Sequence, residues 1–165
     1  MTIRPCRSLF TIVVALVVST TLYAVGSDKG QYIGGTITAL KEKAEAKFDS
    51  SSQTELSFDA GKDGRVSIPY SGIQELEYGQ KANRRVGTAI LISPLALFSK
   101  SRKHYFTITF KDEGGADQVA VFELGKNLFR PLMKTVEVRS GKKLILQDTE
   151  ACKQYKSAKE CEAGK

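Results

Sequence analysis

The sequence predicts a mainly β domain with one C-terminal helix, an α+β fold, and three observations carry this prediction. Short segments rich in β-branched and aromatic residues alternate between apolar and polar positions, which is the period of a strand. Clusters of glycine, aspartate and serine separate these segments, as turns do. Near the C-terminus the period changes to three and four residues, which is typical of an amphipathic helix. At 165 residues the chain has room for one such domain with its own core.

The strands are expected in six alternating segments: 32–40, 55–58, 65–69, 73–78, 104–110 and 118–124. In the first segment, Gly34 and Gly35 indicate a bulge or a close approach of another backbone. The segment that begins at Asp59 superficially resembles a calcium-binding loop, but its third position is Gly61 rather than Asp or Asn and its twelfth is Tyr70 rather than Glu. Because Asp-Gly readily takes positive φ, this segment is expected to be a hairpin turn.

The closing helix is expected over residues 126–139. Leu128, Leu132 and Val136 share one stripe of this helix, which indicates that the stripe faces the sheet. Gly141 is expected to end the helix, because glycine adopts the left-handed conformation of a C-terminal cap. A short strand is expected at 143–147, and residues 148–165 are expected to form a polar tail that contributes little to the core.

Three segments, RVSIPYSGIQELEYG, HYFTITFKDEGG and DQVAVFEL, precede the closing helix. Over about residues 32–147 this succession resembles bacterial pleckstrin-homology-like (PH-like or GRAM-like) domains. The resemblance implies a bent antiparallel sheet or a partly open barrel capped by the helix at 126–139. It also implies a binding role, at a membrane surface or on a protein, rather than catalysis. An apolar segment at 86–98 and an export signal depart from the pattern of that family.

Residues 1–26 are expected to be a signal peptide rather than part of the fold. Arg4 and Arg7 precede an uncharged, largely apolar run from Ser8 to Ser27, which is the arrangement of a secretory signal. The run is also long enough for an uncleaved N-terminal membrane anchor, and this alternative stays open. In either case the body of the protein is expected to be exported, in the periplasm or the cell envelope.

Export changes the expected state of the cysteines. Without residues 1–26, only Cys152 and Cys161 remain, an even pair in an oxidising compartment. We expect them to form a disulfide, with a turn between them because a continuous helix would place them on opposite faces. The alternative, half of a zinc site, has neither a second cysteine pair nor a nearby histidine. No metal site and no cofactor are therefore predicted.

Positive charge is concentrated in one segment. The net charge is +7, and every charged residue from Tyr78 to Lys111 is basic. The same interval holds the apolar residues 86–98, which are too few to cross a bilayer as a helix. The candidate binding residues are Lys81, Arg84, Arg85, Lys100, Arg102, Lys103 and His104. The candidate membrane or partner contacts are Leu91, Leu95, Leu97 and Phe98.

Three interpretations of the apolar residues 86–98 stay open. They form part of the core, with the neighbouring cations exposed at their ends. They enter a bilayer while the cations meet anionic head groups. They pack on an envelope protein, as in a structural or assembly subunit. Nucleic acid is not an expected partner, because few aromatic residues are interleaved with the cations and the compartment is wrong for it.

The sequence carries no enzyme signature. His104 is the only imidazole, and no serine or cysteine is spaced to act with it. Arg102 and Lys103 are expected to lower its pKa, because nearby positive charge disfavours the imidazolium. The predicted function is therefore that of an exported, non-catalytic binding module whose ligand the sequence does not identify.

Overall fold

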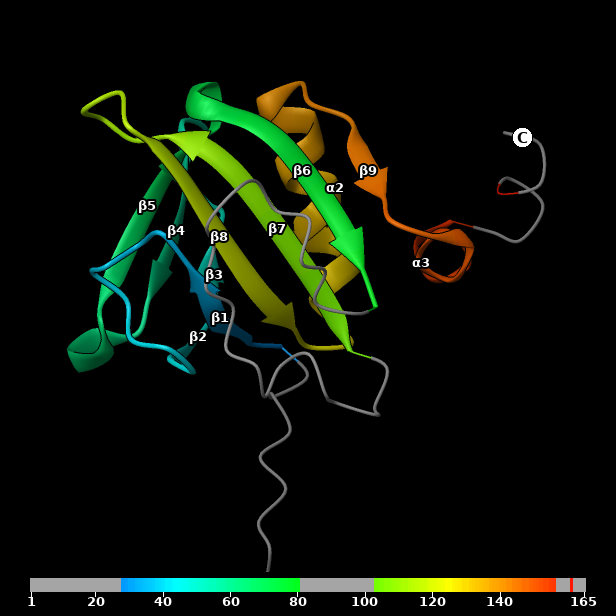
Figure 1. Ribbon diagram of the computed structural model, residues 1–165, viewed down its shortest axis with the longest axis horizontal. Helices are drawn as coiled ribbons and strands as arrows, with labels where there is room; N and C mark the ends of the chain where they lie inside the picture. The colour runs from blue at the N-terminus through cyan, green and yellow to red at the C-terminus, as the bar shows by residue number, and fades with distance from the viewer. Residues whose placement is uncertain (1–27, 81–102, 157–160, 162–165) are drawn as a thin grey trace, which may run out of the picture.

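The computed structural model describes residues 28–80, 103–156 and 161. Within these ranges, nine strands form a six-stranded and a three-stranded sheet, and a helix near the C-terminus packs against them (Figure 1). The expectation of a mainly β fold with a C-terminal helix is confirmed. None of the described helices has the length and apolar character that crossing a membrane requires.

The large sheet has the strand order β2-β1-β8-β7-β6-β9. Its strands are β1 (Gly30–Gly35), β2 (Glu45–Ala46), β6 (Ile73–Gly79), β7 (His104–Lys111), β8 (Asp117–Leu124) and β9 (Leu144–Leu146). All neighbours are antiparallel except β9, which pairs parallel to β6. The sheet is thus mixed rather than wholly antiparallel, because the helix after β8 returns the chain in the direction of β6. The short strand expected at 143–147 is confirmed as β9.

The small sheet consists of β3 (Phe48–Asp49), β4 (Glu55–Asp59) and β5 (Arg65–Pro69). The expected turn between β4 and β5 is confirmed and contains a 3₁₀ turn, η1 (Gly61–Asp63). A second 3₁₀ turn, η2 (Tyr70–Gly72), leads from β5 into β6. Among the described strands, no ladder joins the two sheets and no closed barrel forms.

The strand expected at 32–40 is only half correct. β1 ends at Gly35, which has a φ of +146°, and a Cβ there would lie 2.0 Å from the carbonyl oxygen of Val119. The register of the β1–β8 ladder also shifts between Tyr32 and Gly34. The predicted bulge and close approach are therefore confirmed. Beyond Gly35 the chain leaves the sheet as a loop, and Leu40 enters the core from that loop.

The helix α2 (Phe129–Ser140) covers one face of the large sheet and contributes to its core (Figure 1). Leu132 and Val136 are buried, as the apolar stripe predicts. The helix begins three residues later than expected, because the carbonyl of Gly125 accepts the N–H groups of Leu128 and Phe129 and forms a turn first. Gly141 ends it with a φ of +68°, as predicted.

Aromatic rings join the two sheets. The rings of Phe48, Phe58 and Phe122 lie with centroids 4.9 to 5.0 Å apart, one from each of β3, β4 and β8. At the far end of α2, the Arg139 guanidinium donates to the carbonyls of Ser50 and Ser52. The core therefore extends across both sheets rather than under one.

The C-terminal tail packs on the core, contrary to the expectation from its polar sequence. It forms the helix α3 (Thr149–Tyr155), which begins after Asp148, whose carboxylate accepts the N–H of Ala151 at 2.7 Å. Ala151 is fully buried in the main core, and the Tyr155 ring packs against that core. The expected Cys152–Cys161 disulfide is present, with a Cα–Cα distance of 5.9 Å.

Candidate functional site

Two of the predicted binding residues, Lys103 and His104, lie within the described part of the chain. The others lie outside it: Lys81, Arg84, Arg85, Lys100 and Arg102, together with the predicted contacts Leu91, Leu95, Leu97 and Phe98. Residues 1–26 are also outside it. The site is therefore built from the residues where β6 ends and β7 begins, and from a second cluster near the C-terminus.

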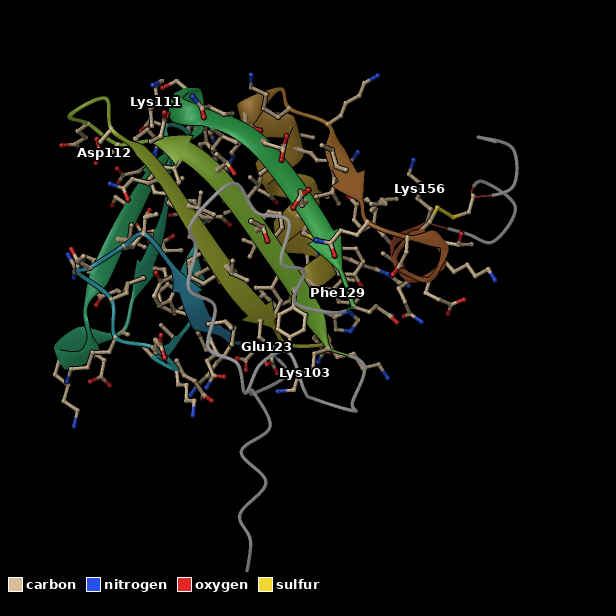
Figure 2. All side chains as sticks on the ribbon, in the orientation of Figure 1. Lys103, Lys111, Asp112, Glu123, Phe129 and Lys156 are labelled. Atoms are coloured by element: carbon tan, nitrogen blue, oxygen red, sulfur yellow. A yellow bond between two sulfur atoms is a disulfide. The ribbon has the colours of Figure 1, made fainter. Side chains whose placement is uncertain are left out.

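Lys103 forms an ion pair rather than offering a free positive charge. Its Nζ lies 2.7 Å from Oε2 of Glu123, whose side chain is only 7% exposed (Figure 2). By strand alternation, Glu123 lies on the face of the large sheet opposite to α2. Tyr105 and Val121 share this face and are buried, although neither belongs to the main core. This second face of the sheet is thus mixed. It carries buried apolar side chains and the Lys103–Glu123 pair, and the register places four polar residues beside them: Glu75, Glu77, Thr107 and Thr109.

His104 is held between aromatic side chains. Its Nδ1 lies 2.7 Å from the hydroxyl of Tyr78, and its ring stacks on Phe129 at a centroid distance of 3.8 Å. Burial lowers the pKa of His104, and the charges of Arg130 and Lys126 lower it further. The direction agrees with the sequence prediction, but burial is the largest cause. The described cations that act on it are Arg130 in the first turn of α2 and Lys126 just before that helix.

The protonation states at this stack follow from its environment. Burial raises the pKa of Tyr78 to about 12, so its hydroxyl keeps its proton at neutral pH. A neutral imidazole can then accept the hydrogen bond from that hydroxyl. His104 therefore fixes the end of β7 against β6 and α2. Among the described residues, no cysteine or serine is hydrogen-bonded to it.

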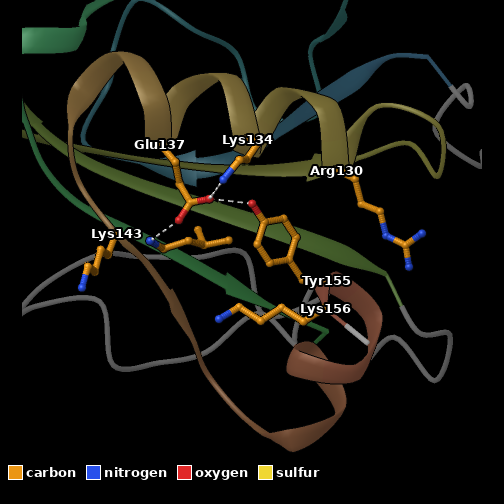
Figure 3. A pocket seen from close by; sticks show the side chains of 7 residues that line it. Arg130, Lys134, Glu137, Lys143, Tyr155 and Lys156 are labelled. Atoms are coloured by element: carbon orange, nitrogen blue, oxygen red, sulfur yellow. Dashed lines mark hydrogen bonds and ion pairs between the residues drawn. The ribbon is translucent and has the colours of Figure 1, made fainter. Parts of the chain in front are cut away.

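A second cluster, which the sequence did not reveal, lies between α2, β9 and α3 (Figure 3). It is an open depression of about 630 Å³ that we call the α2–α3 pocket. Its lining residues are Arg130, Lys134, Glu137, Lys143, Leu144, Tyr155 and Lys156. Four of these side chains are cationic and one is a carboxylate, so the α2–α3 pocket is strongly basic.

Glu137 lies at the centre of the α2–α3 pocket, and both of its oxygens are occupied. One accepts the backbone N–H of Leu144 at 2.9 Å, and the other accepts the hydroxyl of Tyr155 at 2.6 Å. Lys134 approaches the second oxygen at 4.0 Å. Glu137 therefore joins α2 to β9 and α3, and these contacts occupy both of its carboxylate oxygens.

The cations around Glu137 differ in their partners. The Arg130 guanidinium donates to the carbonyl of Gln154 and lies 5.3 Å from the centre of the Phe129 ring. Lys143 and Lys156 are exposed, and no described carboxylate lies within ion-pair distance of either. The α2–α3 pocket thus contains two cations that the described part of the protein leaves unpaired.

The sequence did not indicate this cluster because its members are far apart along the chain. Lys143 and Lys156 meet only because α3 packs back against α2, and the tail was expected to be detached from the core. The apolar residues Ala151 and Tyr155, four apart in an otherwise polar stretch, were the available signal.

Within the described ranges, no group of three or more histidine, cysteine, aspartate or glutamate side chains is arranged to hold a metal ion. The sequence matches no protein-family model, and no curated protein sequence matches it. A functional conclusion must therefore come from the geometry and the charge of these clusters.

Proposed function

We propose that the protein is an exported, non-catalytic binding module that contacts an anionic membrane surface through the basic residues of segment 81–104. The observation that carries this proposal is the positive charge at one end of the large sheet. Gly79 pairs with Tyr105, so the two ends of this segment are attached at adjacent positions of the large sheet. Lys126 and Arg130 lie near enough to His104 to lower its pKa, and so they add positive charge at the same end.

The energetics of such a contact are those of a polybasic surface. Each cation near an anionic membrane contributes about 1 kcal/mol, and the contribution falls as salt screens the charges. Lys103 is excluded from this set because it is paired with Glu123. The other cations of the segment are thus expected to supply the affinity, and the apolar residues 86–98 to supply either core contacts or insertion.

Two features support export. The arrangement of Arg4, Arg7 and the uncharged run after them is that of a signal peptide. The Cys152–Cys161 disulfide fits an oxidising compartment. We therefore propose a mature N-terminus near Val25 or Ser27, which mass spectrometry of protein from its native host would detect. A full-length chain embedded in the membrane would instead indicate the uncleaved anchor.

The proposal also assigns the fold to the PH-like class. Two features support this assignment. The segment RVSIPYSGIQELEYG connects the two sheets, with β5 in the small sheet and β6 in the large one, and a helix packs on the shared core. The parallel strand β9 and the packed helix α3 are additions to the pattern that the resemblance implies.

Co-sedimentation with vesicles of phosphatidylglycerol and of phosphatidylcholine, at low and high salt, tests the proposed function. We expect binding only to the anionic vesicles, with loss of binding at high salt. A variant with four substitutions is expected to lose binding to the anionic vesicles while keeping the melting temperature of the parent protein: Arg84→Gln, Arg85→Gln, Lys100→Gln and Arg102→Gln.

The matched control removes the same charge elsewhere, through Lys41→Gln, Lys62→Gln, Arg65→Gln and Lys111→Gln. Lys41, Arg65 and Lys111 form exposed ion pairs, and such pairs contribute little to stability. The control is expected to keep most of the binding. Equal loss in both variants would mean that net charge alone acts, and would overturn the assignment of the surface.

A further inference from the structure

We propose that the α2–α3 pocket binds an anion that carries a phosphate group. This site shares only Arg130 with the charges assigned to the proposed membrane contact, and it does not depend on that contact. The inference rests on the charge of the α2–α3 pocket, on the occupied state of its single carboxylate, and on the way the tail builds it.

The charge balance of the α2–α3 pocket favours a bound anion. Four cations from α2, from the residues just before β9 and from the end of α3 surround one carboxylate (Figure 3). Gathering like charges raises the electrostatic energy, and a bound anion lowers it again. Lys143 and Lys156 are the two side chains most available for this, because they are exposed and no described carboxylate pairs with them.

The polar groups left for a ligand are donors. Glu137 is already bound by Leu144, Tyr155 and Lys134, so its oxygens are not free to receive a further cation. Burial and the nearby Glu137 raise the pKa of Tyr155, which therefore stays protonated and donates its hydrogen bond to Glu137, so the donors left for a ligand are the cations. Ammonium and guanidinium groups are also donors only, and phosphate oxygens are acceptors.

The number of cations favours phosphate over a single carboxylate. Glu137 offsets one of the four positive charges, which leaves an excess that a dianionic group balances better than a monoanion. An opening of about 630 Å³ has room for a phosphate together with the group that bears it. The phosphate can come from a free phosphorylated anion or from the head group of a lipid.

The tail is needed to complete this site. Lys156 follows directly after α3, and its backbone N–H donates to the carbonyl of Cys152 at 2.7 Å. Cys152 is in turn joined to Cys161. The position of Lys156 therefore depends on α3 being folded against α2, through the Tyr155–Glu137 hydrogen bond.

Calorimetric titration of the disulfide-bonded protein with inorganic pyrophosphate at low salt tests the free-anion source. The variant Lys143→Gln, Lys156→Gln is expected to weaken binding by about tenfold or more, because two charge-assisted contacts are lost. The control Lys41→Gln, Lys62→Gln removes the same charge from the β4–β5 end and is expected to bind like the parent protein. All four lysines are exposed, so neither variant is expected to unfold.

Phosphatidylglycerol vesicles test the lipid source with the same variants. The phosphate would be assigned to a lipid if the parent protein binds the vesicles but not pyrophosphate, and if the variant Lys143→Gln, Lys156→Gln loses the vesicle binding. A parent protein that binds neither probe would overturn the inference, and so would equal losses in the two double variants. The variant with Arg84, Arg85, Lys100 and Arg102 replaced separates the two proposals, because it should lose vesicles but keep pyrophosphate.

Discussion

Three stacked rings lie where β6 ends and where β7 and α2 begin: Tyr78, His104 and Phe129. The His104 ring lies nearly parallel to Phe129, and the Tyr78 ring is stacked with both. A charged imidazole in this position would lose hydration without gaining a carboxylate, since the charges that act on it are those of Arg130 and Lys126. This stack of rings is therefore most stable while His104 is neutral.

This dependence predicts a pH effect on stability. The folded-state pKa of His104 lies below its unfolded value of 6.5, so the unfolded chain binds more protons between these two values. The free energy of unfolding should therefore fall as the pH is lowered from about 7.5 through that window. Denaturant unfolding at several pH values measures this decline, and NMR titration of the single histidine gives its pKa directly.

His104→Gln is the matched variant for this prediction, because an amide can keep a hydrogen bond to Tyr78 without titrating. Four carboxylates have pKa values lowered below their ordinary range by hydrogen bonds, so they titrate well below the window of His104 and do not interfere. They are Asp28, Asp49, Asp59 and Asp112. An unchanged decline in His104→Gln would show that another group is responsible.

At the scale of elements, α2 is the main cover of the large sheet. Leu132→Ala is expected to cost about 2–5 kcal/mol of unfolding free energy, because Leu132 is 4% exposed and truncation leaves a cavity. Lys134→Ala, two residues away with a side chain 71% exposed, should change it by less than about 0.5 kcal/mol. Urea unfolding measures both variants. Comparable losses of unfolding free energy in the two would contradict the orientation of the helix.

The tail makes a second prediction at this scale. Ending the chain after Asp148 removes the buried Ala151, the ring of Tyr155 and the hydrogen bond to Glu137. We expect the melting temperature to fall by roughly 3–8 °C, as losing about 1–2 kcal/mol does in a domain of this size. Replacing both cysteines by serine while keeping α3 should cost at most about 2–3 kcal/mol, because the closed loop is short. An unchanged melting temperature after truncation would show that α3 does not stabilise the core.

For the whole molecule, the large sheet carries buried apolar side chains on both faces. One faces α2 and the small sheet, and the other carries Ile33, Tyr105 and Val121, which are buried outside the main core. Buried apolar side chains on a second face need cover there as well. We therefore expect a core role for the apolar residues 86–98, with the neighbouring cations as the proposed membrane contact.

Leu95→Asp separates these roles. If residues 86–98 are core, a buried unpaired carboxylate should lower the melting temperature by roughly 10 °C or more. This is the result we expect. An unchanged melting temperature, combined with weaker binding to phosphatidylglycerol vesicles, would instead show that Leu95 enters the bilayer.

How far the sequence predicts this molecule depends on the range of the interactions. Features that depend on neighbouring residues were predicted correctly. They are the strand at 104–110, the Asp-Gly turn, the buried stripe through Leu132 and the helix end at Gly141. Gly35 was predicted correctly as a close approach, but the strand was extended past it because β propensity does not show where a partner ends. The α2–α3 pocket depends on tertiary packing of α3, which a polar tail does not indicate.

The ladders that join distant segments also constrain how the chain folds. β1 pairs with β8, so the first strand has its partner near the C-terminus. β6 pairs with β9, so the last strand also pairs with one that lies much earlier in the chain. Contacts of this kind raise the contact order, and high contact order slows folding because long loops must close first. A chain growing from its N-terminus therefore cannot complete the large sheet until residue 146 has been added.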